Sequence, residues 1–331
     1  MKKILEVKDL KIQFKTPNGT IQPVNGTSFH VVEGETLGIV GESGCGKSVT
    51  SLAVMGLLPV PIGYVAAGEI LLEGRDISHL KEKEMRKLRG NDISMIFQEP
   101  MTSLNPVFTI GQQLSEPLKQ HTKLSKKERK KRIVEMLELV GIPRANEIID
   151  DYPHQLSGGM RQRVMISLAM LCEPKLLIAD EPTTALDVTI QAQILDLMKK
   201  IKADTQMAML LITHDLGVVA ETCDRVIVMY AGQIVEGTDV RTLFDDPKHP
   251  YTKGLLASLP KSSERKQDLH AIKGNVPRPD ELPKGCAFSN RCPQSFEKCF
   301  TEKPPLFNME KQSCRCWLYE TEEKEVAVIG K

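Results

Sequence analysis

The stretch Gly41-Glu-Ser-Gly-Cys-Gly46-Lys47-Ser48 decides the fold class of this chain. It follows an apolar run at residues 36–40, which is typical of a buried strand, and it precedes residues 48–58, which have helical character. The pattern G-x-x-x-x-G-K-[ST] between a strand and a helix predicts a phosphate-binding loop. Glycines let backbone N–H groups curl around phosphates, and the helix N-terminus adds positive potential.

Within this loop, we expect Lys47 to reach the β and γ phosphates of a nucleotide and the Ser48 hydroxyl to bind Mg²⁺. Cys45 is expected to contribute its backbone N–H rather than its thiol. The residues predicted to bind nucleotide here are Gly41, Ser43, Gly44, Cys45, Gly46, Lys47, Ser48 and Val49.

The rest of the chain predicts an α/β fold with a largely parallel sheet, because short apolar runs lie between helical stretches. These runs are residues 36–40, 93–97, 176–179, 209–213 and 226–230. Residues 4–14 end in an alternation of apolar and polar side chains, which predicts a further strand with one buried face.

The strand signal disappears between residues 98 and 171. Ile133, Met136, Leu137 and Val140 fall on one face of a helix there. We therefore expect an inserted helical subdomain at about residues 99–171.

Two adjacent carboxylates, Asp180 and Glu181, follow the apolar run at 176–179. Neighbouring side chains on a strand point in different directions, so the two acids can have different roles. Asp180 is expected to hold Mg²⁺, and Glu181 is expected to orient and deprotonate an attacking water.

The segment Leu156-Ser157-Gly158-Gly159-Met160-Arg-Gln-Arg163 resembles the signature motif of the ABC ATPases. A serine followed by two glycines at a helix start makes an N-terminus whose amides can face an anion. In the family, that anion is the γ-phosphate held by the opposite subunit of a head-to-tail pair. Met160 stands where the motif usually has glutamine. The resemblance covers roughly residues 1–320 and implies a P-loop NTPase fold that binds ATP and Mg²⁺.

Other family elements follow in order along the chain. Gln98 resembles the glutamine that contacts Mg²⁺ and the attacking water, and His214 resembles the histidine that contacts the γ-phosphate. Ala185-Leu186-Asp187 resembles the loop that crosses the ATPase dimer. Phe14 lies where the family stacks an aromatic ring on adenine, although a phenylalanine at a strand end is as often part of the core.

The resemblance also implies partners and a location. A nucleotide loop and a signature loop of one domain cannot face each other, so a second ABC ATPase subunit is expected, usually a distinct homologous chain. Two transmembrane permease subunits and an extracytoplasmic binding protein complete the family's assemblies. Lys+Arg 44 against Asp+Glu 43 gives no basic excess, so no nucleic acid partner is expected. No apolar run approaches the roughly 20 residues that cross a bilayer, so we expect a peripheral subunit on the cytoplasmic face of the membrane.

Two stretches, residues 98–106 and 245–256, resemble the ATPases of oligopeptide and dipeptide permeases. They imply ATP hydrolysis that powers import of short peptides. Nickel and glutathione importers use closely similar ATPases and stay open as alternatives. A soluble ABC ATPase acting on nucleic acid or ribosomes is the alternative from another class, although such proteins usually carry two cassettes or long coiled-coil insertions.

The C-terminal part differs in composition. Nine of the 20 prolines lie between Pro247 and Pro305, which predicts a nucleotide-binding domain over residues 1–255 and an extension over 256–331. The extension contains four cysteines that can ligate a metal centre: Cys286, Cys292, Cys299 and Cys316. The segment 285–293 resembles one associated with a [4Fe–4S] cluster in related permease ATPases. Zinc, Cys314 as the fourth ligand, and unligated cysteines remain alternatives.

Overall fold

The computed structural model describes residues 1–17, 19–98, 103–183, 187–259 and 272–320. The chain forms two compact units. The first unit comprises residues 1–5, 31–35 and 72–211, and the second comprises residues 6–30, 36–71 and 212–331. No helix within the described ranges is both long enough and apolar enough to cross a membrane.

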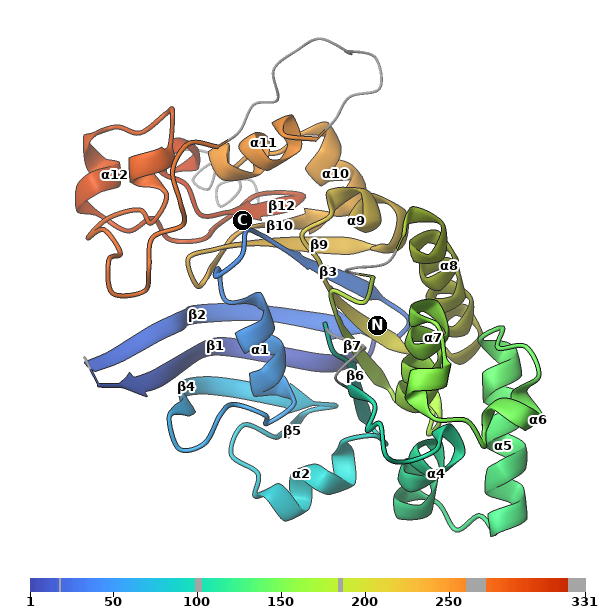
Figure 1. Ribbon diagram of the computed structural model, residues 1–331. Helices are drawn as coiled ribbons and strands as arrows, with labels where there is room; N and C mark the ends of the chain where they lie inside the picture. The colour runs from blue at the N-terminus through green and yellow to red at the C-terminus, as the bar shows by residue number, and fades with distance from the viewer. Residues whose placement is uncertain (18, 99–102, 184–186, 260–271, 321–331) are drawn as a thin grey trace. The chain divides into compact units, whose positions relative to one another are not determined.

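One sheet of the second unit is built on the long strands β1 (Lys3–Thr16), β2 (Gly19–Val32) and β4 (Gly63–Leu72), with β1 in the middle (Figure 1). Along β1, Leu10 and Ile12 are fully buried, whereas the intervening Lys11 and Gln13 are partly exposed. This alternation confirms the strand predicted over residues 4–14.

The other sheet of the second unit contains, in spatial order, β11 (Phe307–Asn308), β12 (Gln312–Cys314), β10 (Gln233–Asp239), β9 (Arg225–Tyr230) and β3 (Thr36–Val40). β3 runs parallel to β9, and all five of its residues are buried, as expected for a strand covered on both faces. β9 and β10 form an antiparallel hairpin. Ala231 and Gly232 both have positive φ in its turn, which is the backbone that tight hairpin turns favour.

The extension takes part in this sheet. β12 pairs antiparallel with β10, and Cys314 lies opposite Glu236. The domain boundary at residue 255 stays a prediction, but residues on both sides of it build one sheet.

Three aromatic rings join the extension to the core of the second unit. They are Tyr230 at the end of β9, Tyr251 in α11 (Pro250–Ala257) and Phe288, and each is at most 2% exposed. The ring centroids of Tyr230 and Tyr251 are 4.7 Å apart, and that of Phe288 lies 5.2 Å and 5.4 Å from them. These spacings fall in the favourable range for aromatic pairs. The other helices of this unit are α1 (Lys47–Val54), α9 (Leu216–Thr222), α10 (Val240–Asp245) and α12 (Glu297–Thr301).

The first unit contains the neighbouring strands β8 (Ala208–Ile212), β7 (Leu176–Asp180) and β6 (Ile93–Ile96). β6 and β7 are parallel, with Ile93 opposite Leu176. Every residue of β7 and β8 is buried. The apolar runs at 93–97, 176–179, 209–213 and 226–230 are thus confirmed as strands. The short strand β5 (Arg75–Asp76) also belongs to this unit.

Helices fill the part of the first unit where the strand signal disappears. They are α4 (Ile110–His121), α5 (Lys126–Leu139), α6 (Ala145–Ile148) and α7 (Gly158–Met170); α2 (Glu82–Leu88) and α8 (Val188–Thr205) lie outside this stretch. α4, α5 and α7 contact one another. α4 and α5 begin with capping boxes at Thr109 and Ser125, which satisfy the first backbone donors of each helix. The face of α5 that was predicted to be apolar is buried, which confirms that this side of the helix packs in the interior.

Replacing Phe288 by alanine should lower the free energy of unfolding of the second unit by about 3–5 kcal/mol, because it empties the centre of the aromatic cluster. Phe296→Ala is the matched control, since Phe296 is 42% exposed. Urea unfolding followed by the fluorescence of Trp317, the only tryptophan, measures both variants. Equal unfolding midpoints for the two variants would contradict the packing described here.

Candidate nucleotide site

The phosphate loop joins β3 to α1 in the second unit, as predicted. Gly46 has φ 103° and caps the N-terminus of α1. A Cβ on Gly46 would lie 2.7 Å from the Pro23 carbonyl oxygen, and one on Gly41 would lie 2.3 Å from that of Met229. Both positions therefore require glycine for space as well as for backbone conformation.

Lys47 lies against this loop. Its side chain is largely buried, and its Nζ donates to the carbonyl oxygens of Gly41 at 2.7 Å and Glu42 at 3.1 Å. Ser43, Gly44 and Ser48 are exposed, and Val49 is partly buried. Cys45 is completely buried, and burial raises the pKa of its thiol. The thiol is thus protonated at neutral pH, in keeping with a role for its backbone alone.

The two carboxylates stand at the end of β7 in the first unit. Asp180 is 5% exposed. Glu181 has φ 48°, an uncommon conformation for a residue with a side chain, and such conformations gather at functional sites. The Gln98 side-chain amide donates to the Glu181 carboxylate at 2.9 Å. The structure therefore brings together two of the predicted catalytic residues, which are 83 positions apart in the sequence.

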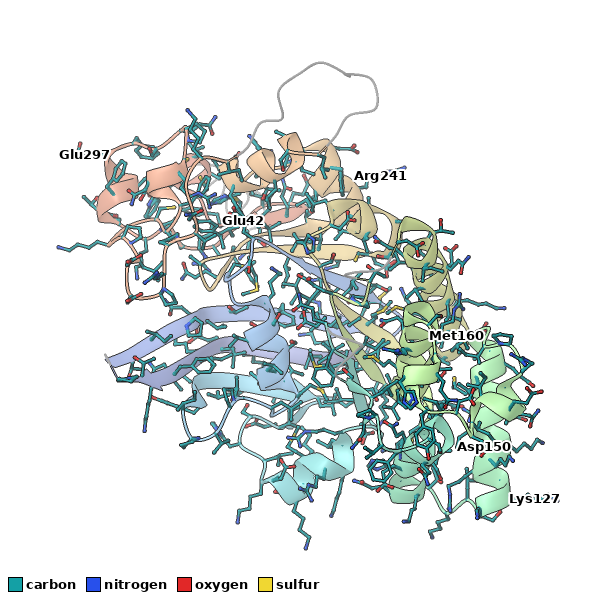
Figure 2. The ribbon with its side chains drawn as sticks, in the orientation of Figure 1. Glu42, Lys127, Asp150, Met160, Arg241 and Glu297 are labelled. Atoms are coloured by element: carbon teal, nitrogen blue, oxygen red, sulfur yellow. The ribbon has the colours of Figure 1, made fainter. Side chains whose placement is uncertain are left out.

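The serine-glycine corner forms the start of α7, as its sequence indicates; Met160 in its first turn is labelled in Figure 2. The Ser157 hydroxyl accepts from the N–H of Met160 at 3.3 Å. A Cβ on Gly158 would meet nothing within 4 Å, so the space beside this backbone is open. A Cβ on Gly159 would lie 3.3 Å from Ile190. The Gln162 amide of α7 donates to the Pro182 carbonyl, which ties this helix to the segment that carries Glu181.

Three further elements were predicted from the family resemblance: His214, the loop at 185–187 and Phe14. His214 is exposed, between β8 and α9. Asp187 caps α8 by accepting from the N–H of Ile190, whereas Ala185 and Leu186 lie outside the described residues. Phe14 is partly buried and its ring lies against Gly63. The roles of all three in nucleotide contact stay predictions.

Four cysteines of the extension line one small cavity: Cys286, Cys292, Cys299 and Cys316. Phe288 and Trp317 also line it. Its volume is about 10 Å³, the space of roughly one water molecule. Cys314 lies in β12 instead and is not part of the lining. The structure thus groups Cys316, rather than Cys314, with the other three thiols.

Burial raises the pKa of the Cys286 and Cys292 thiols and brings that of Cys316 to about 11. Among the residues that the structure describes, no group of three or more His, Cys, Asp or Glu side chains is arranged to hold a metal ion. The four thiols thus share one cavity without forming a metal-coordinating arrangement, and the [4Fe–4S] cluster and zinc remain hypotheses.

Sequence analysis missed the contacts that hold the phosphate loop from outside. Arg291 forms a bidentate ion pair with Glu42, the second residue of the loop. The Tyr251 hydroxyl accepts a hydrogen bond from the Glu42 N–H. Both partners lie in stretches noted for their resemblance to peptide permease ATPases. Glu42 and Arg291 are 249 residues apart in the sequence, and no local sequence pattern indicated that they are in contact.

Comparison with known proteins decides the family. A family model described as ABC transporter matches residues 24–184, and one described as oligopeptide/dipeptide transporter, C-terminal region, matches residues 235–299. The oligopeptide transport ATP-binding protein AppD of Bacillus subtilis (strain 168) is 54% identical over 326 residues, which cover 98% of this chain and 99% of that protein. The chain belongs to the ABC transporter ATPases.

A further relative indicates which group of ABC ATPases this chain resembles. The dipeptide transport ATP-binding protein DppD of the same organism is 50% identical over 331 residues, covering 100% of this chain and 99% of that protein. The resemblance to oligopeptide and dipeptide permease ATPases is therefore confirmed.

Solved structures confirm the fold class. The dimeric structure of MJ0796, a bacterial ABC transporter cassette, has a TM-score of 0.64 at 28% identity and covers 72% of this chain and 99% of that chain. A dimeric post-hydrolysis state of the same cassette, bound to ADP and Pi, gives the same values. The α/β fold of a P-loop NTPase, predicted with the loop at 41–48, and its ABC type, predicted from the resemblance at 156–163, are both confirmed.

Proposed function

We propose that this ABC ATPase hydrolyses ATP to power the import of short peptides through a membrane transporter. One observation carries the proposal: an ABC transporter segment at 24–184 and an oligopeptide/dipeptide transporter C-terminal segment at 235–299 occur in one chain. The names of AppD and DppD, an oligopeptide and a dipeptide transport ATP-binding protein, support the same substrate class.

The described residues suggest how the chemistry is divided. The amides of the phosphate loop and Lys47 bind the phosphates of ATP, and Phe14 stacks on adenine. Ser48, Gln98 and Asp180 provide oxygen ligands for Mg²⁺, an ion that prefers such ligands and offsets negative charge on the phosphates.

Hydrolysis itself would depend on Glu181. This carboxylate orients the attacking water and takes its proton, and the hydrogen bond from Gln98 holds it in place. His214 contacts the γ-phosphate. Because Gln98 lies at the start of the helical subdomain, its contact with Glu181 offers a direct link between hydrolysis and movement of that subdomain.

The serine-glycine corner at Ser157–Gly159 would act on nucleotide held by a second ATPase subunit. Its open backbone and helix N-terminus suit an anion from another chain. We infer a distinct homologous ATPase as that partner, with two permease subunits and an extracytoplasmic peptide-binding protein. The subunit would lie on the cytoplasmic face of the membrane, and no nucleic acid is expected.

Changing Glu181 to Gln should preserve MgATP affinity and lower the turnover number by about 10²- to 10⁴-fold, the usual effect of losing a general base. Glu297→Gln, in the exposed first turn of α12, is the control and should leave both quantities unchanged. Equilibrium nucleotide binding and steady-state phosphate release measure the two effects separately. Near-normal turnover of the Glu181 variant would overturn the assigned role.

The substrate is tested by reconstitution. The chain, co-purified from native membranes with its permease subunits, should take up short peptides in liposomes only when ATP is on the side of this subunit and the peptide-binding protein is on the other. Nickel and glutathione, offered in parallel, should not be taken up. Co-purification with ribosomal or DNA-repair proteins in place of permease subunits would refute transport.

We also propose that Cys286, Cys292, Cys299 and Cys316 hold a [4Fe–4S] cluster. Their grouping around one cavity supports the proposal. Ligands of a cluster bind different iron atoms, so they lie farther apart than the ligands of a single zinc ion. A cavity with space for one water must widen to admit the cluster, and the thiols must lose their protons. Once bound, the cluster would act as a staple for a small proline-rich segment.

Protein purified without oxygen should be brown and contain about four iron atoms per chain. Cys316→Ser should lose most of this iron, whereas Cys314→Ser, the matched control, should retain it. Zinc without iron in the unsubstituted chain would refute the cluster. Equal iron loss in both variants would refute the ligand assignment.

A further inference from the structure

Glu42, the second residue of the phosphate loop and labelled in Figure 2, contacts two segments of the C-terminal part of the second unit through Tyr251 and Arg291. Arg291 Nη1 lies 2.7 Å from Glu42 Oε2, and Nη2 lies 3.0 Å from Oε1. The Glu42 N–H donates to the Tyr251 hydroxyl at 2.8 Å. A side chain and a main-chain group of one loop residue are therefore both held by residues more than 200 positions away.

Arg291 is itself held firmly. Its side chain is only 6% exposed, and it donates to the carbonyl oxygens of Lys273 at 2.9 Å and Gly274 at 3.1 Å. The guanidinium also lies over the rings of Tyr230 and Phe288, with 5.7 Å and 5.9 Å to their centroids. A planar, multiply bonded guanidinium in such surroundings fixes the position of a carboxylate better than a flexible ammonium does.

The contact reaches the residue that meets the phosphates. The Glu42 carbonyl oxygen accepts from Lys47 Nζ at 3.1 Å and from the Cys45 N–H at 3.3 Å. Glu42 is thus bonded to the C-terminal segment through its carboxylate and N–H, and to the loop interior through its carbonyl. Displacing the Glu42 carboxylate would therefore also displace the Glu42 carbonyl oxygen that accepts the hydrogen bond from Lys47.

We propose that Arg291 is a positioning residue of the ATP site: by holding Glu42, it fixes the phosphate loop in its binding shape. The affinity for nucleotide therefore depends on the segment between Cys286 and Cys292, which contains Arg291, although no residue of that segment needs to touch ATP. The proposal rests on ATP binding at this loop.

The test is a double-mutant cycle on MgATP affinity in the full-length chain. Arg291→Met removes the guanidinium and keeps much of the aliphatic stem, and Glu42→Gln removes the charge on the other side. Each change should raise the Kd for MgATP about tenfold, and the double variant should be no weaker than the weaker single variant, because coupled residues are not additive. Arg291→Lys should be intermediate. In the assembled transporter, KM for ATP should rise with these variants while kcat changes much less.

Lys298→Met is the matched control. It breaks another ion pair of the extension, Lys298 with Glu320 at 2.9 Å, and should leave the Kd unchanged. Additive effects of the two changes, an unchanged Kd in a folded Arg291→Met variant, or an equal effect of Lys298→Met would each overturn the proposal. If Arg291→Met does not fold, the comparison of Glu42→Gln, Arg291→Lys and their double variant decides. Absence of MgATP binding by the unsubstituted chain would refute the ATP site itself rather than the Arg291 contact.

Discussion

A phosphate loop has to offer most of its backbone N–H groups to phosphates, so few of them are left to hold its own shape. In this chain the shape is imposed by the surroundings. Gly41 and Gly46 approach the carbonyls of Met229 and Pro23 so closely that no Cβ would fit. Glu42 is held by Arg291 and Tyr251. Strands of both sheets and the C-terminal segment thus shape a loop whose own phosphate-binding residues all lie between positions 41 and 49.

This dependence explains which features were predictable. The loop, the strand before it, the acidic pair after β7 and the helix start at Ser157 are local patterns, in which a few consecutive residues specify the backbone. The buried face of α5 follows from the helical spacing of its apolar residues alone. The hydrogen bond between Gln98 and Glu181 was not predictable from period or composition, although Gln98 was singled out through its resemblance to a family motif and Glu181 as one of two carboxylates after an apolar run.

Long-range contacts escaped the sequence analysis. The pairing of β12 with β10 and the ion pair between Arg291 and Glu42 join residues that are far apart in the chain, and neither residue type is unusual where it stands. The high proline content of the C-terminal part suggested a separate extension. The buried ring of Phe288 and the strand β12 show that this part completes the core and the sheet of the second unit.

The cysteine cavity and the ion pair share one short segment. Ser289–Arg291 form a single 3₁₀ turn between Cys286 and Cys292, so thiols that line the cavity flank the guanidinium that holds the loop. The 3₁₀ turn gives this segment two attachments, one among the thiols and one at Glu42. Its position therefore depends on both.

The place of β12 in the sheet has a consequence for handling the protein. A strand without a neighbour presents a row of main-chain donors and acceptors on which other chains can add. β12 covers that side of β10, and the buried ring of Phe288 belongs to the same C-terminal part. A fragment that stops short of residue 288 would uncover both the main chain of β10 and the rings of Tyr230 and Tyr251, which is the combination that promotes aggregation. The cassette is therefore best produced with its C-terminal segment intact.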